Sequence, residues 1–319
     1  MLTHFRSRAS LAVAFAAFFL GCTEESADLS PIVTAGTLSV FEGELFYQKI
    51  GVGQPVVVLH GGPGLDHTYL RPWFEPLTDT HQVVFYDQRG LGGSRARLNM
   101  SSISMSRYLT DLDRIRERVA QRERIIVLTH SWGAIPALLY ALQVPNRVEA
   151  LILVSPVEPG SRFSSLTSDR QAARRAPADQ RALDSLRASP QFQVRDRKTI
   201  NKLFFHVFRG TFANPDVADS LLAVNLQART VEQGQEVARL LMPPLEGLDF
   251  WDELDQLEVP VLIVHGESDP IPVEMVEMLH ETLPESKLVL LNNTGHFPFI
   301  ENRVEFFGAV RQFLSGLNP

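Results

Sequence analysis

The sequence has one cysteine, Cys22, in 319 residues, so no disulfide can form within the chain. Its longest apolar run, residues 11–20, is too short to span a bilayer comfortably. Lysine and arginine form no cluster and are outnumbered 30 to 37 by acidic residues, which argues against nucleic acid as a partner. The nine histidines are scattered without an HxxxH spacing, so the sequence predicts no metal site and no cofactor.

The N-terminal residues have the pattern of a secretory signal, because Arg6 and Arg8 precede the apolar run. The stretch FLGC at its end resembles a bacterial lipobox. We therefore predict a lipoprotein signal peptide over residues 1–21, lipidation of Cys22 and an acidic tether over residues 22–32. The residue after Cys22 is Thr23 and not the aspartate that retains some lipoproteins at the inner membrane. The anchor is therefore expected in the bacterial cell envelope, at the periplasmic face of the outer membrane. An ordinary signal peptide with a chance cysteine is the alternative.

Strand-like and helix-like patterns alternate from residue 33 onward, which predicts an α/β fold with a mostly parallel sheet and helices on both faces. A hairpin is expected around Glu42 and Gly43. Buried strands are expected at PVVVLH, HQVVFYD, RIIVLTH, VEALILVS, VPVLIVHG and SKLVLLN, and helices over residues 69–77, 103–122, 134–144, 273–283 and 303–314.

One connection is too long for a simple crossover. Residues 158–248 have helical periodicity and no strand-like run, so we predict an inserted helical cap there. The core would then consist of residues 33–157 and 249–319.

Chemically useful residues follow four of the predicted strands. Ser131 lies in THSWGA, between an apolar strand and a helix-like run, and Asp269 and His296 follow later strands. A serine hydroxyl becomes a nucleophile when a histidine accepts its proton, a carboxylate orients that histidine and N–H groups bind the oxyanion. The order Ser131, Asp269, His296 is that of an α/β-hydrolase, and parallel strands would bring all three to one sheet edge.

The turn at Ser131 departs from the usual pattern, because Thr129 occupies a position that normally has no side chain. Gly133 keeps the other small position, so we predict a nucleophile elbow with extra strain. The alternative is a serine that lies between a strand and a helix by chance.

Five stretches resemble the proline iminopeptidases, which are serine aminopeptidases of the α/β-hydrolase fold: HGGPG, YDQRGLGGS, HSWGA, GESD and GHFPFIE. The resemblance implies that Ser131 is the nucleophile, His296 the base and Asp269 the residue that orients it. It also implies an oxyanion hole made by the backbone N–H groups of Gly62 and Trp132. Further residues implied to be structural are Asp87 and Arg89, as an ion pair that holds a turn, and His60, beneath the HGGPG loop.

The resemblance is weaker in the cap, which lacks the tryptophan-rich pattern that carries an ammonium-binding carboxylate in the family. Glu232 and Glu236 lie four apart, and Glu232 is our candidate anchor; a solvated helix face is the alternative. Phe204, Phe208 and Phe212 share one helical face, which predicts either an apolar substrate pocket or packing of the cap on the core.

The sequence thus predicts a serine hydrolase, most simply an aminopeptidase that releases N-terminal proline or a small apolar residue through an acyl-enzyme. The main alternative is an esterase or lactonase-type carboxylic ester hydrolase with the same triad. A catalytically silent lipoprotein that uses the fold for binding is a third hypothesis. The expected partners are a small peptide or small ester substrate and a membrane reached through the N-terminal lipid anchor.

Overall fold

The structure is a computed structural model that describes residues 33–223 and 226–317. The predicted signal peptide, Cys22 and the tether over residues 22–32 lie outside the described residues, so lipidation and location stay predictions. No helix among the described residues is long and apolar enough to cross a membrane.

Within the described residues, nine strands form one sheet in the order β1-β2-β4-β3-β6-β7-β8-β9, with β5 beside β2. The first pairings, β1 with β2 and β2 with β4, are antiparallel, and the pairings from β4 to β9 are all parallel. The predicted mostly parallel sheet is therefore confirmed. The strands are β1 (Val33–Val40), β2 (Gly43–Ile50), β3 (Gln54–Leu59), β4 (His81–Tyr86), β5 (Arg95–Ala96), β6 (Ile125–His130), β7 (Val148–Val154), β8 (Val261–Gly266) and β9 (Ser286–Leu291).

Both faces of the parallel strands β3, β6 and β8 are buried, which explains why their sequences are continuous apolar runs. Val57 of β3 belongs to the apolar cluster beneath α1 (Met105–Ile115), α2 (Ala134–Gln143) and α8 (Val273–Thr282). Val56 and Val58 point to the opposite cluster, which includes side chains of α10 (Arg303–Gly316). The short helix α9 (Pro298–Glu301) precedes α10 on the same side.

The predicted helix over residues 69–77 is wrong as a single element. Three separate 3-10 turns occupy this region, at His67–Tyr69, Arg71–Trp73 and Glu75–Leu77. Pro72 and Pro76 lie near the starts of the second and third turns, where their missing N–H groups prevent a continuous α-helix. The predicted helix over residues 103–122 is also shorter, because α1 passes into a π-helical turn at Arg116–Ala120.

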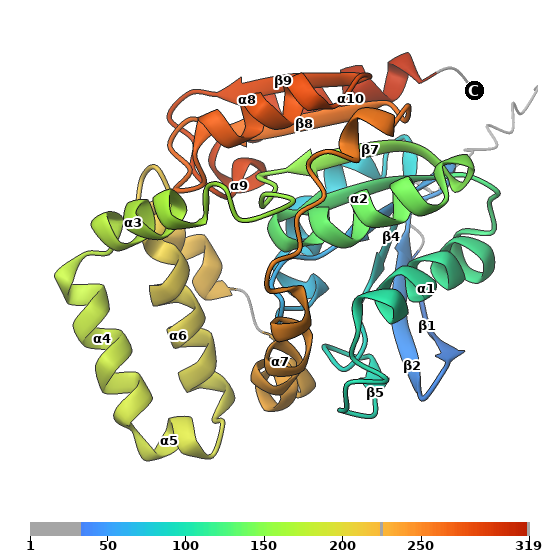
Figure 1. The fold of residues 1–319 in the computed structure, drawn as a ribbon. Coiled ribbons are helices and arrows are strands. Elements are labelled where there is room, and N and C mark those ends of the chain that lie inside the picture. Colours follow the sequence, from blue (N-terminus) through green and yellow to red (C-terminus); the bar gives the residue numbers. More distant parts are fainter. Residues whose placement is uncertain (1–32, 224–225, 318–319) are drawn as a thin grey trace, which may run out of the picture. The chain divides into compact units, whose positions relative to one another are not determined.

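The connection from β7 to β8 is helical, as predicted. It contains α3 (Ser164–Arg174), α4 (Pro177–Ala188), α5 (Pro190–Gln193), α6 (Arg197–Phe208) and α7 (Ala228–Leu241). Figure 1 shows α3 to α6 beside the sheet, with α7 returning toward the core. These helices and the sheet belong to one compact unit.

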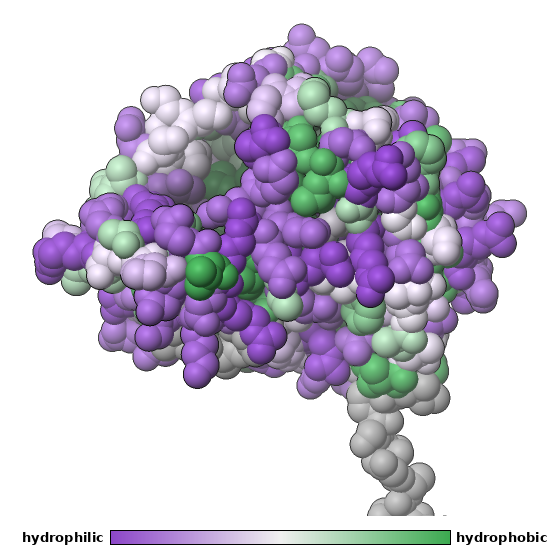
Figure 2. Space-filling view, turned by 90° about the horizontal axis from the view of Figure 1, so that it is seen from below, coloured by the Kyte–Doolittle hydropathy of each residue, from purple (hydrophilic) through white to green (hydrophobic). Residues whose placement is uncertain are grey.

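The surface seen in Figure 2 is mostly hydrophilic, and its hydrophobic residues form small separate groups. This distribution is expected when helices cover both faces of an apolar sheet, because scattered apolar residues are normal on protein surfaces.

A buried ion pair attaches the turn after β4 to helix α1. Arg89 donates two hydrogen bonds to the carboxylate of Asp111, at 2.7 and 2.5 Å, and both side chains are almost fully buried. The predicted pair of Arg89 with Asp87 is therefore wrong, because Asp87 bonds to His67 instead. Burial raises the pKa of Asp111 to about 6, although the guanidinium of Arg89 opposes this shift.

Removing one partner of this pair should destabilise the fold strongly. Asp111→Ala would leave the Arg89 guanidinium buried without a counter-charge, so the free energy of unfolding should fall by about 3 to 5 kcal/mol. Urea denaturation measures this change. The double variant Arg89→Met, Asp111→Leu should recover much of the loss, and Asp252→Ala, which breaks a surface pair with Arg162, should change stability little. Equal effects of Asp111→Ala and Asp252→Ala would contradict the prediction.

Candidate active site

Ser131 lies at a sharp turn between β6 and α2. Its φ of 53° is in the left-handed region, and the 3-10 turn Ser131–Gly133 leads directly into α2. A Cβ at Gly133 would lie 2.8 Å from the carbonyl oxygen of Leu59, so a glycine is needed at that position. This geometry is that of the predicted nucleophile elbow.

The predicted crowding at Thr129 does not appear as a distorted backbone. Thr129 pairs regularly with Leu59 of β3 and Leu153 of β7, and the left-handed residue is Ser131. The close approach of chains falls at Gly133, two residues after the serine. The side chain of Thr129 is buried and its hydroxyl has no hydrogen-bond partner among the described residues.

Asp269 and His296 are hydrogen-bonded to each other. Nδ1 of His296 lies 2.8 Å from Oδ2 of Asp269, and both residues are buried. The other carboxylate oxygen accepts from the backbone N–H of Ile271 at 2.9 Å. Burial raises the pKa of Asp269, but the charges and hydrogen bonds around it, led by His296, outweigh burial and lower the pKa. A carboxylate bonded to Nδ1 in this way fits the predicted role of Asp269, which is to orient the imidazole.

The loop that carries His296 is held by a carboxylate that the sequence analysis missed. Glu301 accepts hydrogen bonds from the N–H groups of Gly295 and Phe297, at 3.0 and 3.3 Å, on one oxygen. Its other oxygen accepts from the N–H of Ala213, at 2.8 Å. Glu301 is the last residue of the motif GHFPFIE. Its position five residues after the histidine was the available signal.

His130 connects three loops around the turn at Ser131. Its Nε2 donates to the carbonyl oxygen of His296 at 2.8 Å, so its Nδ1 accepts from the hydroxyl of Tyr69 at 2.8 Å. That hydroxyl in turn accepts from the N–H of Gly61 at 2.7 Å. Burial, and then the charge of His296, lower the pKa of His130 to about 3. A neutral His130 thus positions its neighbours.

The HGGPG loop after β3 passes close to the turn at Ser131. Gly62 has a φ of 133°, and the bond from Gly62 to Pro63 is cis. His60 is fully buried beneath this loop, as expected, and its Nε2 accepts from the N–H of Gln88 at 3.0 Å. Gly62 and Trp132, the predicted oxyanion-hole residues, both line the same cavity as Ser131.

A cavity of about 530 Å³ lies between the sheet edge and the cap. Ser131, Asp269 and His296 all line it, so the structure brings the three predicted catalytic residues together. Its cap-side wall includes Phe208 of α6 and the face of α3 that carries Thr167. A cavity of this size accommodates a small-molecule substrate.

The prediction of Glu232 as an ammonium anchor is wrong. Glu232 is exposed and does not line the cavity, because α7 turns the face containing Val231 and Gly234 inward. Glu236, the other candidate, forms a surface ion pair with Arg239 at 2.6 Å. Both glutamates therefore belong to a solvated helix face, which was the alternative prediction.

The three predicted cap phenylalanines have different environments. Phe208 lines the main cavity, with its ring 4.8 Å from that of Phe204. Phe204 lines only a separate cavity of about 180 Å³, so its proposed contact with substrate is not supported. Phe212 stacks on Phe297, 4.8 Å between ring centroids. Two of the three thus pack the cap on the core, and one reaches the main cavity.

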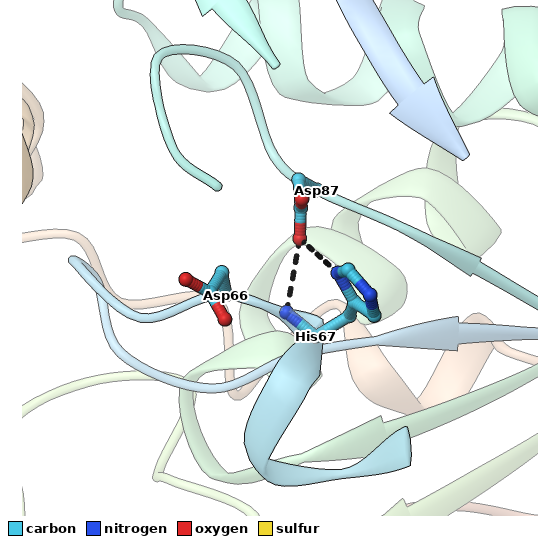
Figure 3. A group of neighbouring side chains, drawn as sticks. All are labelled: Asp66, His67 and Asp87. Atoms are coloured by element: carbon cyan, nitrogen blue, oxygen red, sulfur yellow. Dashed lines mark hydrogen bonds and ion pairs between the residues drawn. The ribbon is translucent and has the colours of Figure 1, made fainter. Parts of the chain in front are cut away.

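Asp66, His67 and Asp87 form a buried cluster with potential metal ligands within 4.8 Å of one another (Figure 3). Asp87 accepts from the N–H and Nδ1 of His67, at 2.9 and 2.7 Å. The oxygens of Asp66 accept from Thr68 and, on the cap side, from the N–H of Gln227 at 2.9 Å. A metal ion would have to displace these donors. The cluster therefore fits a hydrogen-bonded attachment of the cap better than a metal site.

Comparison with known proteins agrees with this geometry. Residues 54–303 match the α/β hydrolase fold family. A proline iminopeptidase of Saccharolobus solfataricus is 25% identical over 291 residues, which cover 84% of this chain and 87% of that protein. Among solved structures, a proline iminopeptidase of Mycobacterium smegmatis has a TM-score of 0.67 at 22% identity, covering 89% and 98% of the two chains. A thermophilic esterase of Thermogutta terrifontis has a TM-score of 0.65 at 25% identity, covering 91% and 100%.

The burial of Glu301 predicts how stability depends on pH. Burial raises its pKa from about 4.5 to about 7, although its three N–H donors oppose this shift. Between these pH values the folded protein keeps a proton on Glu301 that the unfolded chain has released. The free energy of unfolding should therefore fall as pH rises through this window, by about 3 kcal/mol from this group.

Glu301→Gln should flatten this decline, because an amide does not titrate. Denaturation of wild type and variant at several pH values between 4 and 8 measures the two slopes. Glu305→Gln, which replaces an exposed carboxylate of the same helix region, should keep the wild-type slope. Parallel curves for wild type and Glu301→Gln would count against a raised pKa at this site.

Proposed function

Because this chain belongs to the α/β-hydrolase fold family, we propose that it is a serine hydrolase whose catalytic triad is Ser131, His296 and Asp269. The hydrolase class agrees with its relatives among the proline iminopeptidases. The observation that carries the proposal is the 2.8 Å bond between His296 and buried Asp269 at the wall of the cavity that Ser131 lines.

We propose the following reaction for these groups. Nε2 of His296 accepts the proton of the Ser131 hydroxyl while the serine oxygen attacks the substrate carbonyl carbon. The N–H groups of Gly62 and Trp132 stabilise the oxyanion that forms. His296 then gives the proton to the leaving amine or alkoxide, and the scissile bond breaks. Water, activated by the same histidine, releases the acid from the acyl-enzyme and restores Ser131.

Among peptide substrates, an aminopeptidase substrate fits the cavity best. Release of an N-terminal residue requires a carboxylate that binds the substrate ammonium close to the serine. Glu158 and Asp269 are the carboxylates among the described cavity residues, and Asp269 is taken by His296. The segment of Glu158 lies beside the turn, because the N–H of Val157 is 3.5 Å from the carbonyl oxygen of Ser131. Glu158 thus replaces Glu232 as the proposed anchor.

The carboxylate of Glu158 is held at the start of helix α3. Its two oxygens accept from the N–H of Phe163 and the hydroxyl of Ser164, at 2.8 and 2.7 Å, at the N-terminus of α3. The positive end of that helix stabilises a negative charge. A carboxylate has about four acceptor sites, so acceptor capacity remains for an ammonium group. The proposed specificity is for N-terminal proline or a small apolar residue.

A carboxylic ester hydrolase is the second candidate. It is favoured by the apolar residues around the serine, including Ile135, Phe208 and Phe297, and by the lack of a tryptophan in the cap. An ester needs no ammonium anchor, so the two candidates differ in their dependence on Glu158.

Ser131→Ala should reduce turnover by several orders of magnitude and leave the fold intact, since removal of a triad member leaves only binding and oxyanion stabilisation. Rates on prolyl anilides and aryl esters measure the loss, and circular dichroism checks the fold. A fluorophosphonate should label Ser131 in the wild type, as peptide mapping would show. Labelling at another serine would refute the assignment.

Glu158→Gln should lower kcat/KM for a free-amine prolyl anilide by about tenfold to a hundredfold, mostly through KM, because a charge-assisted hydrogen bond is lost. The N-acylated anilide and a neutral aryl ester should be affected little. Glu232→Gln is the matched control, since it removes an exposed carboxylate of the cap. It should leave the rates on all three substrates unchanged. Wild-type enzyme that cleaves both anilides equally would instead support the ester hydrolase.

A further inference from the structure

One face of α3 forms a polar wall of the cavity. The wall residues recur at helical spacing and are Ser164, Thr167, Ser168, Gln171 and, at the C-terminal end of the helix, Arg175. No residue of α3 is buried, so the polar groups of this face are accessible from the cavity, apart from the Ser164 hydroxyl, which bonds to Glu158. The face is therefore available to a bound molecule with hydrogen-bonding groups.

Arg175 carries a positive charge that no described carboxylate neutralises. It is the single lysine or arginine among the described residues that line the cavity. Its guanidinium makes one long hydrogen bond, 3.4 Å, to the amide oxygen of Gln180, and no ion pair in the described part of the chain. The nearby carboxylate of Asp179 is occupied by His206 and Arg209, at 2.8 and 3.3 Å. A half-buried guanidinium facing a cavity is suited to bind an anion.

The backbone places Arg175 on the side of the cavity where His296 lies. The C-terminal end of α3 packs on Gly210, where a Cβ would lie 3.6 Å from the backbone nitrogen of Arg175. The next residue, Thr211, accepts a hydrogen bond from the N–H of His296 at 2.9 Å. Glu158 lies at the opposite end of α3, beside the turn at Ser131. The two charges thus mark the two ends of one wall.

We propose that Arg175 binds the C-terminal carboxylate of a short peptide whose N-terminal ammonium is held by Glu158. This proposal rests on the proposed aminopeptidase function and names its substrate class. The leaving amine would then extend toward Arg175, on the side where His296 donates its proton.

The length of α3 sets the length of the peptide. Its 11 residues span roughly 16 Å at the helical rise. An extended peptide spans roughly 3.5 Å per residue, so four or five residues would cover the helix. The arginine side chain can reach back along the wall, so we expect peptides of about three or four residues to be preferred.

The test compares peptides of two to six residues, such as Pro-Ala-Ala, with their C-terminal amides. For the wild type, kcat/KM should be about tenfold or more higher for the acid than for the amide at three or four residues. Arg175→Gln should abolish this ratio by lowering the rate on the acid alone. Arg175→Lys should keep part of it, because lysine retains the charge but lacks the planar fork.

Arg181→Gln is the matched control, because Arg181 is an exposed arginine of α4 that does not line the cavity. It should leave the ratio of acid to amide unchanged. Equal rates on acid and amide in the wild type, or an equal loss on both in Arg175→Gln, would overturn the proposal.

Titration calorimetry on Ser131→Ala separates this inference from the proposed function, since it measures binding without turnover. Ser131→Ala should bind the acid more tightly than the amide, and the double variant Ser131→Ala, Arg175→Gln should lose this difference. That result would support the carboxylate site even if the wild type cleaved no peptide. In that case the aminopeptidase proposal alone would fail. Equal binding of acid and amide, together with cleavage of both, would refute the carboxylate site and keep the aminopeptidase.

Discussion

The left-handed backbone at Ser131 determines where the other groups of the site must lie. The chain leaves a fully buried strand and enters α2 within three residues, so the serine stands at the carboxyl edge of the sheet. This turn is possible because Gly133 passes close to the carbonyl oxygen of Leu59. The loops after β3, β8 and β9 end at the same edge, since parallel strands all point toward it. A cost in backbone strain at one residue thus places the side chain of Ser131 at the sheet edge, among three loops.

The cap is attached to these loops by hydrogen bonds at buried positions. Thr211 and Ala213 hold the loop of His296, directly and through Glu301. Asp66, beside the HGGPG loop, accepts from the first residues of α7, where Gly64 and Gly234 approach closely enough to exclude a Cβ. The positions of His296 and of the HGGPG loop therefore depend on the docking of the cap. A change of cap sequence can alter specificity only if these attachments persist.

Charges in the site are arranged by burial. His130 remains neutral because burial and the nearby His296 disfavour its protonation, so it serves as a hydrogen-bonding link. Asp269 remains ionised because histidines surround it. The cavity walls then expose one carboxylate, Glu158, and one guanidinium, Arg175, at opposite ends of the largely hydroxyl-bearing face of α3. This pair of opposite charges is complementary to the two charged ends of the peptide proposed as substrate.

Sequence patterns alone predict the sheet and the order of Ser131, Asp269 and His296 along its edge. Continuous apolar runs identify buried parallel strands, and the residues that follow such strands must meet at one edge. Gly133 and the HGGPG loop are also recognisable in the sequence, because both are local features of a turn. The cap helices were also recognisable, since helical periodicity is local.

Sequence patterns do not predict which side chains of the cap face the cavity, because this depends on how the cap packs on the core. Periodicity identifies an apolar face of α7 but not what packs against it, and docking of Gly234 on Gly64 left Glu232 exposed. The sequence likewise does not identify the partners of Arg89 and Asp87. Each charge can pair with any polar residue that the fold brings near it, and these residues are Asp111 and His67. Glu301 bonds to Ala213 of the cap, Arg175 lies beside Gly210, and the segment of Glu158 contacts Ser131, and each of these contacts joins segments well separated in the chain. Such contacts depend on packing in three dimensions, which a local pattern does not record.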